Sequence, residues 1–178
     1  MDRGYIYLNK KSFLHNIEVL KNLSRKKLCL VVKANSYGHG LDWAVKNAKE
    51  SGVKWFAVAS VDEGMQVKKV YEESRVLLLA EPSITQLENV KGNNIDLTVY
   101  NENFIDALIE TGDEFSVHLK IDTGMHRLGC PPEKFYDLSG SITYISVISY
   151  SFYNSYNPDD LNLGNIILSL LIIVWAIR

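Results

Sequence analysis

Short apolar runs alternate with longer stretches of helical period over most of the chain, and this alternation is the strongest constraint on its fold. It predicts repeated βα units built on a parallel sheet. The expected strands cover residues 28–33, 55–59, 76–79, 96–100 and 115–121, with a poorer candidate at 142–148. The expected helices cover residues 12–23, 41–50, 61–73, 84–90 and 103–110.

The fold class that best suits this pattern is a (β/α)8 TIM-type barrel. No Gly-x-Gly-x-x-Gly turn follows any of the expected strands, so a dinucleotide-binding fold is not indicated. Such barrels need eight strands and about 250 residues, whereas five or six strands are expected in these 178 residues. We therefore expect only part of a barrel.

The composition is that of an ordinary globular protein, with 47% hydrophobic and 22% charged residues. The formal net charge of -2 gives no electrostatic reason to expect nucleic-acid binding. Cys29 and Cys130 lack metal-ligand or redox spacing, so we expect no metal site and a reduced, cytoplasmic setting. The first residues lack the apolar core of a signal peptide.

The carboxyl-terminal part is unusually apolar. Residues 161–177 contain no charged side chain, and residues 166–177 are almost entirely apolar. That run is shorter than the roughly 20 residues of a transmembrane helix. The length favours a buried element or an aberrant chain end over a membrane-associated tail.

Lys33 stands at the end of the apolar run 28–33, and Gly38 and Gly40 follow it in a loop where backbone could approach a ligand. Burying an ammonium group is costly. A lysine at such a strand end therefore either reaches solvent or serves as a base or a covalently bonding amine. Taken alone, a solvated lysine is the commoner case.

A second polar segment ends another expected strand. Strand alternation places His118, Lys120 and Asp122 on one face, whereas a buried parallel strand is normally apolar on both sides. These residues face either a polar cavity or an ion-pair network in which Arg127 pairs with Asp122. The simplest interpretations of other polar residues are structural: His39 is a loop histidine, and Asp62 and Glu63 interact with a helix dipole.

Two polar loops, each with basic residues, follow strands whose carboxyl ends share one edge of the sheet. This arrangement suits an anionic ligand, and its expected residues are Lys33, Tyr37, Lys120 and Arg127. The Walker phosphate-binding motif is absent from the sequence. The residues alone do not identify the reaction.

Two segments carry a family resemblance. Residues 31–40 read Val-Val-Lys-Ala-Asn-Ser-Tyr-Gly-His-Gly and resemble the cofactor-lysine signature of alanine racemases. Residues 120–129 read Lys-Ile-Asp-Thr-Gly-Met-His-Arg-Leu-Gly and resemble the second hallmark of that family. Residues 56–64 are similar to the strand and helix start between them. The resemblance covers about residues 5–138, so we divide the chain into a racemase-like barrel portion, 1–138, and a divergent apolar tail, 139–178.

The resemblance implies an isomerase that uses pyridoxal 5'-phosphate to interconvert L-alanine and D-alanine for peptidoglycan, and that works as a homodimer. Lys33 would hold the cofactor covalently and then act as the base on the D-side. Tyr37 would donate a hydrogen bond to the cofactor phosphate, and Arg127 would contact the cofactor hydroxyl and the substrate carboxylate. Lys120, often carbamylated in this family, would orient Arg127.

The sequence also departs from the family pattern. Position 126 is His where Gly is common, and the match fades after Leu138. The Thr-His pair, the arginine at the pyridine nitrogen and the L-side tyrosine that follow in the family are not recognised here. We therefore expect the amino-terminal part of a racemase, active only if missing segments complete it. The alternatives are a non-catalytic barrel that binds pyridoxal phosphate and an inert fragment with open strand edges.

Overall fold

The computed structural model describes residues 4–144 of the chain. Within them lies one five-stranded parallel sheet in the sequential order β1-β2-β3-β4-β5. Its strands are β1 (Cys29–Val31), β2 (Trp55–Val58), β3 (Arg75–Leu78), β4 (Ile95–Val99) and β5 (Val117–Leu119). Each neighbouring pair is parallel, so all five carboxyl ends lie at the same edge. This is the arrangement of consecutive strands in an incomplete TIM-type barrel, which confirms the predicted fold class.

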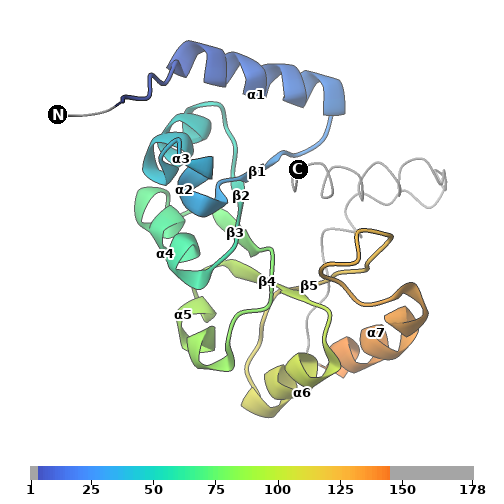
Figure 1. Ribbon diagram of the computed structural model, residues 1–178. Helices are drawn as coiled ribbons and strands as arrows, with labels where there is room; N and C mark the ends of the chain where they lie inside the picture. Colours follow the sequence, from blue (N-terminus) through green and yellow to red (C-terminus); the bar gives the residue numbers. More distant parts are fainter. Residues whose placement is uncertain (1–3, 145–178) are drawn as a thin grey trace. The chain divides into compact units, whose positions relative to one another are not determined.

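Helices connect the strands and lie along one side of the sheet (Figure 1). The α-helices are α1 (Lys10–Ser24), α2 (Lys33–Tyr37), α3 (Leu41–Glu50), α4 (Val61–Val70), α5 (Leu87–Val90), α6 (Glu102–Thr111) and α7 (Phe135–Tyr144). Two short 3-10 helices are η1 (Ile84–Gln86) and η2 (Pro132–Lys134). The predicted helix at 84–90 is thus divided into η1 and α5.

The core lies between the sheet and these helices. Phe56 and Val58 of β2, and Leu78 of β3, are fully buried in it together with Val67 of α4. Burying each such side chain stabilises the fold by about 1.5–3 kcal/mol. At Gly64 of α4, a β-carbon would lie 3.5–3.7 Å from aliphatic side chains of β2, β3 and β4, which is ordinary van der Waals contact, so this helix packs directly on the sheet.

The structure corrects the sixth predicted strand. Residues 142–144 belong to α7, and the rest of the 142–148 segment lies outside the described residues. The helical period explains the outcome, because Leu138 and Ile142 are four residues apart and both are buried. The apolar run 161–177 also lies outside the described residues, and within 4–144 no helix is long and apolar enough to cross a membrane.

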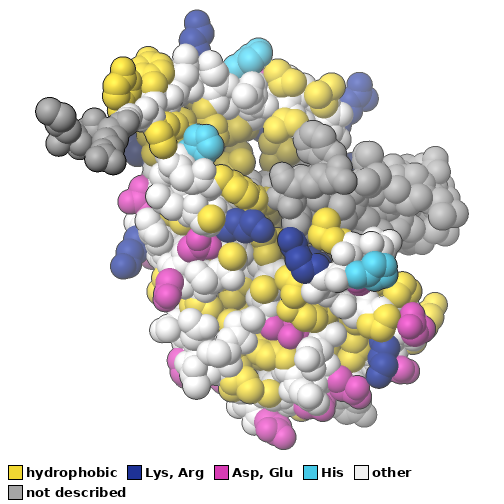
Figure 2. All heavy atoms as spheres, in the orientation of Figure 1, with side chains coloured by type: hydrophobic (Ala, Val, Ile, Leu, Met, Phe, Trp, Pro, Cys, Tyr) yellow, Lys and Arg dark blue, Asp and Glu magenta, His cyan; other side chains and the backbone are white. Residues whose placement is uncertain are grey.

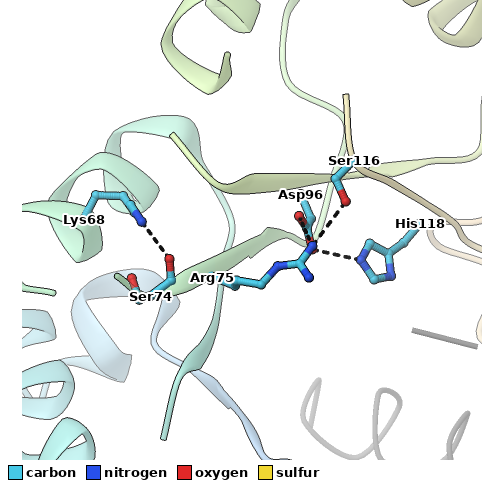
Figure 3. A network of polar contacts seen from close by, with 6 residues as sticks. All are labelled: Lys68, Ser74, Arg75, Asp96, Ser116 and His118. Carbon is cyan, nitrogen blue, oxygen red and sulfur yellow. Dashed lines mark hydrogen bonds and ion pairs between the residues drawn. The ribbon is translucent and has the colours of Figure 1, made fainter. Parts of the chain in front are cut away.

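A polar network connects the first halves of β3, β4 and β5 (Figure 3). Arg75 Nη2 lies 2.9 and 3.0 Å from the two carboxylate oxygens of Asp96, which is 1% exposed. His118 Nε2 lies 3.2 Å from the same carboxylate, and Arg75 also donates to Ser116 Oγ at 3.4 Å. His118 therefore belongs to an ion-pair network, one of the two alternatives that the sequence left open.

The charge state of Asp96 depends on this network. Burial alone would raise its pKa, but the hydrogen bonds and the charges of His118 and Arg75 together outweigh burial and lower the pKa below its ordinary value. The contribution of the carboxylate to stability is therefore present at neutral pH and is lost as the pH falls through the lowered folded-state pKa. The Arg75 guanidinium also lies 4.4 Å from the centre of the Trp55 ring.

We predict that Asp96→Asn lowers the free energy of unfolding by about 2–3 kcal/mol, somewhat less than a fully enclosed ion pair because Arg75 is half-exposed. Urea denaturation at pH 7 measures the effect. Asp106→Asn, which changes an exposed carboxylate on α6, is the matched control. The loss should shrink in acid, and equal stability of both variants at pH 7 would contradict the prediction.

Candidate functional site

The segment after β1 carries an unusual backbone conformation. β1 ends at Val31, and Lys33 begins α2, whose next four residues, 34–37, have φ angles of 51–54°. None of these four is glycine. A left-handed conformation costs an L-residue roughly 1–2 kcal/mol, so four in succession need support from their surroundings. Lys33 is therefore followed directly by a strained turn.

Hydrogen bonds within the segment supply part of that support. The N–H of Gly40 donates to the Asn35 carbonyl at 2.9 Å, and the Asn35 side-chain oxygen accepts the N–H of Leu41 at 2.8 Å, the first residue of α3. His39 Nδ1 lies 2.9 Å from the Ser36 carbonyl, a contact within the loop. Asn35 was not among the residues expected at this site, because its bond to Leu41 spans six positions and lies outside local capping patterns.

Glu63 supplies support from another element. Its carboxylate accepts the N–H of Ala34 at 2.6 Å and the N–H of Ala59 at 2.9 Å. From the sequence, we expected Glu63 to interact only with the dipole of its own helix. It does lie in the first turn of α4, but it also joins the turn after β1 to the end of β2.

The segment after β5 forms a loop whose two ends are joined by backbone hydrogen bonds. The N–H of Asp122 donates to the Cys130 carbonyl, and the N–H of Cys130 donates to the Lys120 carbonyl, both at 2.8 Å. A β-carbon at Gly129 would lie 2.6 Å from the Asp122 nitrogen, so the close approach requires glycine. Residues 122–129 thus form a closed loop that carries Arg127.

The Asp122 carboxylate holds this loop from inside. One oxygen accepts the N–H groups of Gly124 and His126, each at 3.0 Å, and these bonds lower the pKa of Asp122. His126 has a φ of 54°, where the family often has Gly, and its Nδ1 lies 3.5 Å from the other oxygen. In residues 4–144, Asp122 pairs with His126 and not with Arg127.

The two loops bring three cations together. Burial lowers the pKa of Lys120, and the positive charges of Arg127 and Lys33 lower it further, whereas Asp122 raises it by less. Figure 2 shows Lys and Arg side chains close together near the middle of the drawn face. Tyr37 lies on the same turn as Lys33 and is half-exposed. The structure therefore places Lys33, Lys120 and Arg127 in one electropositive region.

This region can bind anions, and its amines can attack a carbonyl when neutral. Metal ligation has no comparable support, because residues 4–144 contain no group of three His, Cys, Asp or Glu side chains that could hold an ion. Lysine chemistry at the carboxyl ends of parallel strands is thus the chemistry that the geometry favours.

Comparison with known proteins agrees with this geometry. The sequence profile described as "Alanine racemase, N-terminal domain" matches residues 8–149. The chain belongs to the alanine racemase family. Helicobacter pylori alanine racemase is 32% identical over 135 residues, which are 72% of this chain and 36% of that protein. An Enterococcus faecalis protein named amino-acid racemase is 34% identical over 134 residues, 74% of this chain and 19% of that protein.

Solved alanine racemases share the fold. The crystal structure from Oenococcus oeni superposes with a TM-score of 0.70 and 30% identity, over 78% of this chain and 41% of that one. The biosynthetic alanine racemase from Pseudomonas aeruginosa also gives a TM-score of 0.70, with 28% identity, over 75% of this chain and 38% of that one. The chain thus spans about a third of the curated Helicobacter alanine racemase and corresponds to its amino-terminal part.

We predict that amine-reactive labelling of Lys120 has a lower midpoint pH than labelling of a lysine in a short unstructured peptide, because burial and the charges of Arg127 and Lys33 lower the pKa of Lys120. Arg127→Gln should move the Lys120 midpoint upward, since it removes one repelling charge. Mass spectrometry of labelled peptides across a pH series measures both midpoints. Lys134→Gln, an exposed cation outside this region, should leave the Lys120 midpoint unchanged.

We predict that Gly129→Ala destabilises the racemase domain by about 1–3 kcal/mol, because the new methyl group meets backbone atoms that side-chain rotation cannot move away. Gly124→Ala is the matched control: its φ is also positive, at 136°, but nothing lies within 4 Å of its β-carbon position. Denaturant unfolding compares them. A loss at Gly129 no larger than that at Gly124 would contradict the prediction.

Proposed function

We propose that this chain carries the pyridoxal 5'-phosphate site of a racemase that interconverts L-alanine and D-alanine. The observation that supports the proposal most is the convergence of Lys33, Lys120 and Arg127 at the carboxyl ends of β1 and β5. Family membership supports the same assignment. D-alanine supply for peptidoglycan, a homodimer and a cytoplasmic location follow as parts of the proposal.

The residues present fit this cofactor. Pyridoxal phosphate offers an aldehyde to an amine and a phosphate to cations, and the region contains both kinds of partner. Burial, together with the positive charges of Arg127 and Lys33, lowers the pKa of Lys120, and a bound anion would relieve the repulsion among these cations. When bound, the cofactor supplies the electron-withdrawing ring that makes the α-proton of an amino acid removable.

Each side chain then has a task. Lys33 would hold the cofactor through its side-chain amine, and the same amine would move the α-proton on one face of the substrate. Arg127 would bind the substrate carboxylate, and the Tyr37 hydroxyl would donate a hydrogen bond to the cofactor phosphate. Lys120, when carbamylated, would be an anion that accepts hydrogen bonds from Arg127 and orients it. The lowered pKa of Lys120 supports its carbamylation, because only a neutral amine adds to carbon dioxide.

Racemisation needs a second proton-transfer group on the opposite face of the substrate. The chain spans about a third of the Helicobacter alanine racemase. We therefore propose that racemisation occurs only when other segments add the second proton-transfer group to this site. Cofactor binding requires only the groups assigned above. Because the Enterococcus relative is named amino-acid racemase, amino acids other than alanine should also be assayed as substrates.

We predict that purified chain mixed with pyridoxal phosphate shows the visible absorbance of a lysine-bound cofactor, and that Lys33→Ala abolishes it. Lys27→Ala removes an exposed lysine before β1 and should keep the absorbance. Borohydride reduction and peptide mass mapping identify the bonded lysine. Racemisation is assayed in the same samples by following the loss of optical rotation of L-alanine.

The absorbance tests the cofactor site, and the racemisation assay tests whether this chain alone supplies both proton-transfer groups. Absorbance that Lys33→Ala abolishes supports the proposal. Absorbance without racemisation fits both a racemase site that needs other segments and a barrel that binds the cofactor without catalysis. A soluble, folded chain that gives no absorbance would overturn the cofactor assignment.

A further inference from the structure

Glu63 lies in the first turn of α4, yet its carboxylate reaches beyond that helix. One oxygen accepts the N–H of Ala34, the residue after Lys33, at 2.6 Å. The other accepts the N–H of Ala59, the residue after β2, at 2.9 Å. A single side chain therefore joins two neighbouring strand ends at the point where Lys33 leaves the sheet.

The parallel ladder between β1 and β2 stops at this point. The N–H of Val32 still donates to the carbonyl of Ala57 at 2.9 Å. The carbonyl of Val32, however, accepts the N–H of Ser36 at 2.8 Å, inside the left-handed turn. The next N–H groups that would donate across this ladder are those of Ala59 and Ala34, and they need other acceptors. Both donate to the Glu63 carboxylate.

Local helix capping does not account for these bonds. In a capping box the carboxylate of the third helical residue returns to the N–H of the cap residue, which is Ser60 here. Ser60 does accept the N–H of Glu63 at 3.3 Å, but the Glu63 carboxylate binds Ala59 and Ala34 instead. The bond to Ala34 joins residues 29 positions apart in the sequence.

We propose that Glu63 is a positioning residue for Lys33, because it fixes the peptide group that follows the lysine and so sets the direction of its amine. This inference rests on the proposed cofactor role of Lys33. The peptide plane between Lys33 and Ala34 shares the Lys33 α-carbon, so holding its N–H restricts the backbone angle ψ of the lysine. Glu63 also anchors the first residue of the strained turn, which persists only where its surroundings determine it.

The test compares wild type with Glu63→Gln and Asp62→Asn. Gln has the shape of Glu, but it has a single acceptor oxygen, and its NH2 group would face one of the two N–H groups. Asp62 is an exposed acid in the same helical turn, so its neutralisation reproduces any loss of helix-dipole interaction without touching either N–H. The readout is the rate at which pyridoxal phosphate, fixed with borohydride, labels Lys33 relative to the other lysines.

Labelling selective for Lys33 in wild type and Asp62→Asn, with the Lys33 rate lowered about 10- to 100-fold in Glu63→Gln, supports the inference. A Glu63→Gln protein that labels Lys33 as fast as wild type overturns it while leaving the proposed function in place. Wild type that labels Lys33 no faster than its other lysines overturns both. Circular dichroism of each variant shows whether the fold is retained.

If Glu63→Gln does not fold, the wild-type chain still decides the matter. An amide proton held in a hydrogen bond exchanges slowly with solvent deuterium. The amide protons of Ala34 and Ala59, which the Glu63 carboxylate accepts, should therefore both be protected from exchange. An Ala34 amide that exchanges as fast as an amide in an unstructured peptide overturns the inference.

Discussion

Parallel pairing of β1 to β5 is the constraint on which the rest of the structure depends. Because every strand points the same way, the segments after β1 and β5 emerge at one edge although they are about 90 residues apart in the sequence. The helices of the βα units bury one face of the sheet and hold that edge in place. The charge of Lys33 lowers the pKa of Lys120 only because this arrangement brings the two strand ends together.

Where parallel ladders end, backbone N–H groups lose their partners, and here carboxylates replace them. Glu63 serves the ends of β1 and β2, and Glu81 accepts the N–H groups of Tyr100 and Asn101 after β4, at 2.7 and 2.8 Å. Asp122 does the same within the loop after β5. Burial raises the pKa of Glu81 more than the bonds from Tyr100 and Asn101 lower it. The charged form of Glu81 is therefore stabilised less than that of Asp122, whose pKa is lowered.

The sequence predicted the periodic features well. Helical and strand periods identified the βα units, and motif resemblance selected Lys33, Tyr37, Lys120 and Arg127. Periodicity and motifs do not predict which distant residues come into contact. The bond between Glu63 and Ala34 depends on strand register, and the pairing of His118 with Asp96 depends on which strands are neighbours. The left-handed turn of residues 34–37 was also hidden, because none of these residues is the glycine that usually signals it.

The use of carboxylates at the strand ends also explains the charge of the candidate site. The whole chain has a formal net charge of -2, yet Lys120 is surrounded by an excess of positive charge. Asp122 is close enough to raise the pKa of Lys120, but it faces the N–H groups of its own loop and compensates only in part. Acids that hold the loops in place therefore leave the cations available, and an anionic ligand is the partner that would neutralise them.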